Sequence, residues 1–293
     1  MLAMRSDVRS MRRKYFSASL ASRILLASGL ALAAPAAAMA QTAPSLAAGD
    51  VTYPLIANLT LNADVVLTAT ISAIDRQSAK EAPDVQPGYN RFVIRAAVTG
   101  VLLAPRAVPG EIVYVWDAPE ATFGKRPKLK GEPVLLFLRA IPGNDRIYQL
   151  VAQNAQMLKP GQAVDLVRKV AADPIRGSGF GYRVTGVADA TRMQRRADED
   201  FATHFLVETA EKGMLTVSVP ETAGGGGTIQ VELPDSLGET QPLQQQSLLG
   251  YFLACGLPES LPESVLETAA AMGDADAVRA DYKRLRASVG PCQ

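Results

Sequence analysis

The sequence predicts a mainly β protein with a helical C-terminus: an OB-like five-stranded barrel, a second small β-sheet module and a three-helix cap tied by a disulfide. Three observations predict this fold class. Apolar residues alternate with a period of two through residues 61–158, and again between residues 182 and 233. From residue 241 onward they recur at helical spacing. Both cysteines of the chain, Cys255 and Cys292, lie in that last segment.

The first 40 residues are expected to be a signal peptide rather than part of the fold. Six Lys and Arg residues precede an apolar run from Ile24 to Ala37, and Ala38-Met39-Ala40 carries the small residues that a signal peptidase accepts. The apolar run is shorter than the roughly 20 residues of a membrane span. We therefore expect a periplasmic or secreted protein cleaved after Ala40, with no transmembrane segment after cleavage. The general secretory and twin-arginine routes both remain open.

Composition and charge exclude several classes of protein. Of the 293 residues, 48% are hydrophobic, 6% aromatic and 20% charged, which argues against a disordered chain, a collagen and a disulfide-rich miniprotein. Without residues 1–40, 24 Lys and Arg face 28 Asp and Glu, so the net charge of +1 becomes −4. An acidic chain is not expected to bind nucleic acid.

The barrel is predicted within residues 61–158, after a flexible lead-in over residues 41–60 that is rich in Ala, Pro, Gly and Thr. The run Val134–Leu138 is apolar on both faces, which is typical of a central, covered strand. Pro109-Gly110 and the segment 142–145 are turn signals. The five strands are expected at 65–73, 92–99, 112–116, 134–138 and 147–151.

A short helix and an antiparallel β module are predicted within residues 162–240. Helical spacing over residues 162–172 ends at Asp173-Pro174. Alternating runs then occur at 182–187 and 201–208 and in two strands joined by residues 222–227, four of which are glycines. A loop of that kind favours a hairpin over a phosphate-binding loop, because a strand follows it rather than a helix.

Residues 241–293 are predicted to form the helical cap. Ser260 and Glu263 have capping-box spacing for the second helix, and the third carries an apolar stripe that includes Val278, Tyr282 and Leu285. In an exported chain an even pair of cysteines indicates a disulfide, here between Cys255 and Cys292. A cysteine nucleophile or metal site is the alternative, although no histidine lies near either cysteine in the sequence.

Four strand-and-glycine motifs follow one another in a fixed order in the barrel segment. They are Ala63-Asp64-Val65-Val66, Val98-Thr99-Gly100-Val101-Leu102, Pro109-Gly110-Glu111-Ile112-Val113 and Gly131-Glu132-Pro133-Val134-Leu135-Leu136-Phe137-Leu138. This order resembles the OB-like barrel of netrin-type modules, the class that contains the tissue inhibitors of metalloproteases. Those inhibitors use a cysteine at the mature N-terminus to ligate the zinc of the target. Gln41 stands there in this chain, so the inhibitory mechanism does not carry over.

The C-terminal motifs Leu253-Ala254-Cys255-Gly256-Leu257-Pro258 and Gly290-Pro291-Cys292 are similar to those of uncharacterised exported proteins of Gram-negative bacteria. That resemblance covers the whole mature chain and implies export, but it implies no activity.

Residue types that carry catalysis are sparse. His204 is the one histidine and alternates with large apolar residues, so we expect a hydrogen-bonded or solvated strand histidine. Zinc sites built from Cys and His are excluded by number, and no Gly-x-Ser-x-Gly elbow is present. The acidic residues 198–200 follow Arg192 and read as a solvated charge run. Trp116, the single tryptophan, is expected in the core rather than as a carbohydrate platform. We expect no catalytic, cofactor-binding or metal-binding residues.

Lys125, Arg126, Lys128 and Lys130 place four cations within six residues of an otherwise acidic chain. Loops at the strand ends of OB-like barrels line the ligand groove, so these residues are candidates for contact with an anionic envelope component or an acidic protein surface. The alternative is a solubilising loop. The sequence thus favours a non-catalytic binding module of the cell envelope. A hydrolase using carboxylates or a lone serine remains the alternative, since it would leave no recognisable motif.

Overall fold

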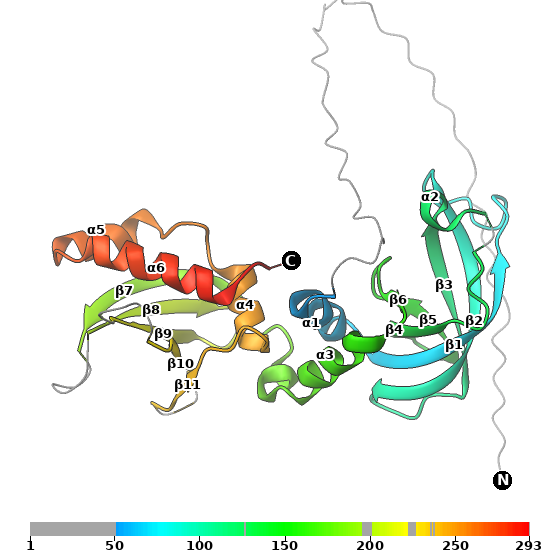
Figure 1. The fold of residues 1–293 in the computed structure, drawn as a ribbon, viewed down its shortest axis with the longest axis horizontal. Coiled ribbons are helices and arrows are strands. Elements are labelled where there is room, and N and C mark those ends of the chain that lie inside the picture. The colour runs from blue at the N-terminus through cyan, green and yellow to red at the C-terminus, as the bar shows by residue number, and fades with distance from the viewer. Residues whose placement is uncertain are drawn as a thin grey trace, which may run out of the picture. The chain divides into compact units, whose positions relative to one another are not determined.

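Two β-sheets form the framework of the chain (Figure 1). The computed structural model describes residues 51–125, 127–194, 201–221, 227–234, 236 and 238–292. Within them a five-stranded barrel closes, a second antiparallel sheet follows, and helices occupy the C-terminus. The predicted fold class is therefore confirmed. The expected signal peptide and residues 41–50 lie outside the described residues.

The barrel contains all five predicted strands. In sheet order they are β1 (Val65–Arg76), β2 (Tyr89–Leu103), β3 (Glu111–Pro119), β5 (Asn144–Leu150) and β4 (Pro133–Ile141). A second edge of β1 pairs with β4 and closes the barrel. Only the β3–β5 pairing among these is parallel. Register shifts interrupt the β1–β2 pairing, and such bulges bend and twist a strand enough for it to reach both neighbours. The closed barrel is compatible with an OB-like fold.

The barrel core consists of the inward-facing side chains of these strands. Trp116, Tyr114 and Phe92 are its largest fully buried members. On β4, Leu136 points into this core, whereas its neighbours Leu135 and Phe137 are buried in a second apolar cluster outside the barrel. The predicted burial of β4 on both faces is confirmed, and Trp116 is a core aromatic as expected.

Residues 53–61 form a helix, so the prediction of a flexible lead-in is wrong for this segment. Helix α1 (Tyr53–Leu61) begins at Thr52, whose hydroxyl accepts a hydrogen bond from the Leu55 amide at 3.4 Å. Ile56 and Leu59 are buried in the second apolar cluster. A capping threonine followed by an early proline is a helix-start signal. The helix is too short to be stable in isolation, so its packing decides its structure.

A short connecting region leads to the second sheet. Strand β6 (Gln156–Leu158) pairs with β4, helix α3 (Gly161–Ala172) confirms the predicted helix, and the 3₁₀ turn η1 (Pro174–Ser178) follows it. In sheet order the described strands are then β11 (Thr240–Pro242), β10 (Gln230–Glu232), β9 (Met214–Pro220), β8 (Ala202–Thr209) and β7 (Val184–Met193). All of these pairings are antiparallel.

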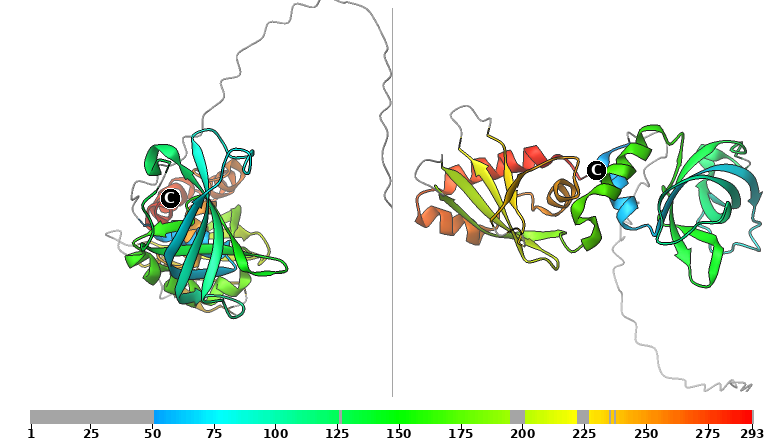
Figure 2. Two further views of the ribbon diagram at one scale, coloured as in Figure 1. Left: turned by 90° about the vertical axis from the view of Figure 1, so that its right-hand side faces the viewer. Right: turned by 90° about the horizontal axis from the view of Figure 1, so that it is seen from below.

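The C-terminal helices are α4 (Leu248–Gly256), α5 (Glu263–Ala271) and α6 (Ala275–Val289). Helices α5 and α6 lie along one face of the second sheet (Figures 1 and 2). The predicted capping box is wrong: α5 begins at Glu263 with Pro262 at the cap position and no side-chain cap. Proline disfavours helical backbone in the residue before it, so the helix starts too late for Ser260 to cap it.

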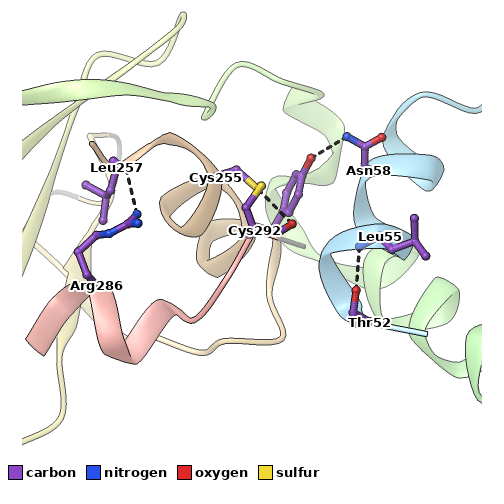
Figure 3. Close-up of a disulfide and its surroundings, with 8 residues drawn as sticks. Thr52, Leu55, Asn58, Cys255, Leu257, Arg286 and Cys292 are labelled. Carbon is purple, nitrogen blue, oxygen red and sulfur yellow. Dashed lines mark hydrogen bonds between the residues drawn. A yellow bond between two sulfur atoms is a disulfide. The ribbon is translucent and has the colours of Figure 1, made fainter. Parts of the chain in front are cut away.

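The disulfide between Cys255 and Cys292 is present, with an S–S distance of 2.03 Å (Figure 3). It joins the end of α4 to the segment after α6. Three hydrogen bonds tie α6 to the same region: Arg286 Nη1 donates to Leu257 O at 3.0 Å, Tyr282 Oη to Pro258 O at 2.5 Å, and Gln245 Nε2 to Ser288 O at 2.7 Å.

Candidate functional site

The predicted basic residues lie in the loop between helix α2 (Glu120–Phe123) and strand β4, where α2 follows the end of β3 (Figure 1). We call residues 124–132 the basic loop. Lys125, Lys128 and Lys130 are exposed to solvent. Arg126 lies outside the described residues. The structure therefore leaves three of the four predicted contact residues accessible.

The backbone of the basic loop is held against the barrel. Leu129, only 8% exposed, is buried in the barrel core. The Gly131 amide donates to Ile71 O at 2.8 Å, and the Ile71 amide donates to Glu132 O at 3.1 Å. Gly131 has φ 87°, a conformation that glycine adopts without strain. Lys128 and Lys130 thus flank an anchored residue and extend from a fixed backbone.

A buried asparagine holds the start of the loop. Asn90, 5% exposed, accepts a hydrogen bond from Arg76 Nη2 at 2.6 Å. Its amide group donates to Glu120 Oε2 at 3.3 Å and to Gly124 O at 3.5 Å. At the end of α2, the Phe123 ring meets the buried Trp116 edge-on, with centroids 4.7 Å apart. Helix α2 is therefore positioned by both polar and aromatic contacts.

The lysines of the loop differ in how far their charge is compensated. Lys125 Nζ lies 3.6 Å from Glu120 Oε1, and both side chains are exposed, so this pair contributes at most about 1 kcal/mol. Neither Lys128 nor Lys130 forms an ion pair with a carboxylate in the described part of the chain. Among the described residues of the loop, these two ammonium groups are the uncompensated cations.

Arg91 of the barrel, in contrast, is committed to structural ion pairs. Arg91 lies 2.7 Å from Asp117 through Nη2 and 2.9 Å from Asp84 through Nη1. Hydrogen bonding to Asp117 raises the pKa of Arg91, and hydrogen bonding from Arg91 lowers the pKa of Asp84. Because Asp84 belongs to the long β1–β2 connection, Arg91 fastens that connection to β3. Its guanidinium is not available to a ligand.

His204 has a structural environment, as predicted. It lies on β8 opposite Ser218 of β9, 9% exposed, and its Nδ1 is 2.8 Å from Ser218 Oγ. A serine hydroxyl at this distance provides a hydrogen-bond partner for one ring nitrogen of a strand histidine.

The predicted charge run around Arg192 lies only partly within the described residues, since residues 195–200 are outside them. The part that is described is not simply solvated. Arg192 is paired with Glu221, and its Nη1 lies 3.7 Å from Asp274 Oδ1. Arg192 therefore links the strand ends to the turn before α6, a use that the sequence pattern did not indicate.

The most buried carboxylate of the C-terminal region is also structural. Asp281, 8% exposed, accepts a hydrogen bond from Thr203 Oγ1 at 2.5 Å and lies 2.8 Å from Arg284 Nη2. Arg284 Nη2 also donates to Pro220 O at 2.7 Å. This network attaches α6 to β8 and β9.

Two further properties concern the described residues as a whole. No group of three or more His, Cys, Asp or Glu side chains gathers there in a way that could hold a metal ion. None of the helices in the same residues has the length and apolarity required to cross a membrane.

Sequence analysis missed one cation near the basic loop. Lys159 follows β6, is exposed, and its amide donates to Pro133 O at the start of β4 at 3.3 Å. Its φ of 54° lies in the left-handed region. The sequence signal, a lysine followed by Pro160-Gly161 between a strand and a helix, marks a turn but does not reveal which strand lies beside it.

Comparison with known proteins adds no assignment: no protein-family model matches the chain, and no curated protein matches its sequence. The function is therefore argued from the geometry alone.

Proposed function

We propose that the protein is an exported, non-catalytic binding module of the cell envelope, and that the basic loop contacts an anionic envelope component. One observation carries the proposal: Lys128 and Lys130 are exposed and uncompensated by described carboxylates, on a backbone that Leu129 anchors in the barrel core. A fixed backbone loses little conformational entropy on binding, so more of the Coulombic attraction is realised as affinity.

The export part of the proposal rests on the signal-peptide pattern of residues 1–40 and on the disulfide, a bond that persists in oxidising compartments. We also propose that the chain is related to netrin-type modules and to exported proteins of Gram-negative bacteria, as the sequence resemblances imply. The closed barrel supports it at the level of the OB-like fold.

Charge distribution favours the barrel as the region that meets an anion. Residues 61–158 carry eleven Lys and Arg against nine Asp and Glu, whereas residues 159–293 carry thirteen against eighteen. Attraction of a polyanion is therefore expected at the barrel and repulsion over the rest of the chain. An acidic protein surface is the competing partner, and the test below separates the two.

The test measures retention of residues 41–293 on immobilised lipopolysaccharide at low salt. A variant with Lys125→Gln, Arg126→Gln, Lys128→Gln and Lys130→Gln should elute earlier, and the difference should shrink as salt rises, because exposed charges are screened over about 8 Å at physiological ionic strength. Its melting temperature should change little, since exposed charges contribute little to folding.

The matched control changes four exposed cations elsewhere, with Lys80→Gln, Arg139→Gln, Arg146→Gln and Lys283→Gln. The net charge changes by the same amount in both variants. If both elute earlier to the same extent, retention depends on the overall charge and not on the basic loop. If the wild type is not retained at low salt on lipopolysaccharide, the envelope ligand is excluded. Retention on an acidic protein alone would then favour the competing partner.

A further inference from the structure

We infer that Lys159 belongs to the same anion-contact surface as Lys128 and Lys130, and that this surface binds a ligand with closely spaced phosphate groups. The inference rests on the proposed function and adds to it a residue and a ligand chemistry.

Backbone pairing places Lys159 beside the end of the basic loop. Strand β6 pairs with the first residues of β4, with Leu158 opposite Val134. The next residue, Lys159, donates its amide proton to Pro133 O at 3.3 Å. Pro133 directly follows residues 124–132. Lys159 is therefore a neighbour of the end of the basic loop along the backbone pairing, although strands β4, β5 and β6 separate them in sequence.

The backbone conformation of Lys159 is unfavourable for lysine. Among the described residues it is the one non-glycine residue with positive φ, at 54°. A residue with a Cβ atom adopts this region at a cost of about 1–2 kcal/mol, and glycine and asparagine adopt it more readily. The side chain is exposed and forms no ion pair with the described carboxylates. Packing and pairing thus do not account for a lysine here, whereas contact with a ligand does.

Acidic residues are nearly absent from the two backbone segments that carry these three ammonium groups. Glu132 is the one carboxylate within residues 124–133 and 156–164. The first turn of α3, which follows Lys159, carries no acidic residue. The next carboxylate along the chain, Asp165, lies 2.9 Å from Arg168. Three cations therefore face solvent from two adjoining backbone segments with little local neutralisation.

The residue type points to the ligand chemistry. Lysine acts as a compact point charge with rotatable donors, and it binds phosphate without the two-pronged geometry that arginine imposes on carboxylates. Three such charges on fixed backbones engage a ligand best when several anionic oxygens lie close together. Clustered phosphates meet this requirement, in a free polyphosphate or in a diphosphorylated lipid headgroup, whereas isolated carboxylates can engage only one lysine at a time.

The experiment titrates residues 41–293 with inorganic tripolyphosphate at low salt, using calorimetry. Lys159→Asn removes the charge but supplies a residue suited to positive φ, so the variant should be at least as stable as the wild type. We expect its affinity to fall about 3- to 5-fold, the size of one exposed charge contact. Lys159→Arg should restore binding, and Lys283→Gln, an exposed lysine on α6, should leave it unchanged.

A second arm distinguishes the two sources of clustered phosphate. Vesicles of zwitterionic lipid alone are compared with vesicles that also contain a diphosphorylated lipid, and Lys159→Asn should weaken sedimentation with the latter. Binding in either arm that depends on Lys159 supports the inference, and the arm with the larger effect identifies the source.

Three outcomes overturn the inference, and they differ in what they imply for the proposed function. If Lys159→Asn binds like the wild type while the four-residue loop variant does not, Lys159 is no part of the surface and the proposed function stands. If polyglutamate binds as tightly as tripolyphosphate, the phosphate chemistry is wrong and anion contact still stands. If neither polyanion nor either vesicle is bound at low salt, the proposed function falls as well.

Discussion

The barrel and the second sheet solve the same burial problem in different ways. The barrel encloses its own core, and residues between 65 and 158 supply all the buried members of that cluster. The second sheet is open, and its apolar face is covered by helices. Its core cluster includes Phe205 and Val217 from the sheet, Phe252 and Leu285 from the helices, and Ile56 from α1. Closure lets the barrel bury its inner core with its own residues, although Leu135 and Phe137 on the outer face of β4 belong to the second cluster. The sheet depends on segments far away in sequence to cover its apolar face.

Because one region is a closed barrel and the other an open sheet, they also use buried polar contacts differently. In the barrel, Tyr114 Oη donates to Gln156 at 2.6 Å in the interior, and most ion pairs lie at the surface. In the C-terminal region the buried Asp281 network attaches a helix to the sheet. An open sheet needs specific contacts to hold its covering helices in register. A closed barrel does not, so its surface side chains are available for a ligand.

The largest expected effect tests the shared core. Phe205, fully buried, packs against Tyr282 with ring centroids 5.6 Å apart. Phe205→Ala should lower the free energy of unfolding by about 3–5 kcal/mol, through lost burial and a residual cavity. Urea denaturation measures the change. Val115→Ala, at an exposed barrel position, is the control and should change stability by less than about 1 kcal/mol. Equal effects would contradict the burial that the cluster implies.

The disulfide should contribute nearly as much. Cys255 and Cys292 are 37 residues apart in sequence, and closing such a loop contributes about 3–4 kcal/mol in the chain-entropy model. A Cys255→Ser, Cys292→Ser variant should therefore unfold at lower urea concentration, while the hydrogen bonds of Arg286 and Tyr282 keep α6 in place. Reduction of the wild type should reproduce the shift. Loss of the helical circular dichroism signal in the variant would show that these hydrogen bonds do not suffice.

The polar attachment of α6 should have a smaller effect. Asp281→Ala removes the acceptor of Thr203 and the carboxylate partner of Arg284, which keeps its hydrogen bond to Pro220 O. We expect a loss of about 1–3 kcal/mol, less than for a fully buried pair because the Arg284 side chain is one-third exposed. Asp75→Ala, which removes the exposed barrel pair with Arg95, should cost less than about 1 kcal/mol. If Asp75→Ala loses more stability than Asp281→Ala, the expected greater importance of polar contacts in the C-terminal region is wrong.

Alkaline pH should weaken the C-terminal region. Burial raises the pKa of Tyr282 to about 12, whereas an unfolded tyrosine titrates near 10. The folded state thus holds its proton more tightly, so the stabilisation is complete below pH 10 and is lost as pH rises toward 12. Urea denaturation at a series of pH values should show this fall in the wild type. Tyr282→Phe should reduce the slope of the free energy of unfolding against pH. An unchanged slope would show that other groups cause the loss of stability.

The smallest effect concerns the β1–β2 connection of the barrel. Hydrogen bonding from Arg91 lowers the pKa of Asp84, so the contact is present above the ordinary pKa of an aspartate and is lost as pH falls through the lowered value. Limited proteolysis should therefore cut residues 77–88 faster at acidic pH, using an acid-active protease. In Asp84→Asn the cutting rate should already be high at the upper end of the pH range of the protease, where Asp84 of the wild type is ionised and paired with Arg91. If the cutting rate of the wild type does not depend on pH, the ion pair of Arg91 with Asp84 does not fasten the β1–β2 connection.

Local sequence patterns were sufficient to predict the barrel strands, because each strand buries one face and its apolar residues therefore alternate along the sequence. Phe92, Ile94 and Ala96 all point inward, and the turn glycines separate one strand from the next. The third C-terminal helix was predicted equally well from its apolar stripe, and Val278, Tyr282 and Leu285 of that stripe are all buried. In contrast, α1 was not predicted because it lies at the end of a segment rich in Ala, Pro, Gly and Thr. The capping-box spacing at Ser260 was overridden by the backbone preference that Pro262 imposes.

The sequence by itself determined the five barrel strands, helix α3, the helical C-terminus, the disulfide pair and the four cations of the basic loop, because each of these is expressed in neighbouring residues or in a count. Only the tertiary structure decided which surfaces meet. Lys159 joins the basic loop through the pairing of β6 with β4, and Lys125 is partly neutralised by Glu120. Such relations depend on contacts between residues distant in the chain, and periodicity within one segment carries no information about them.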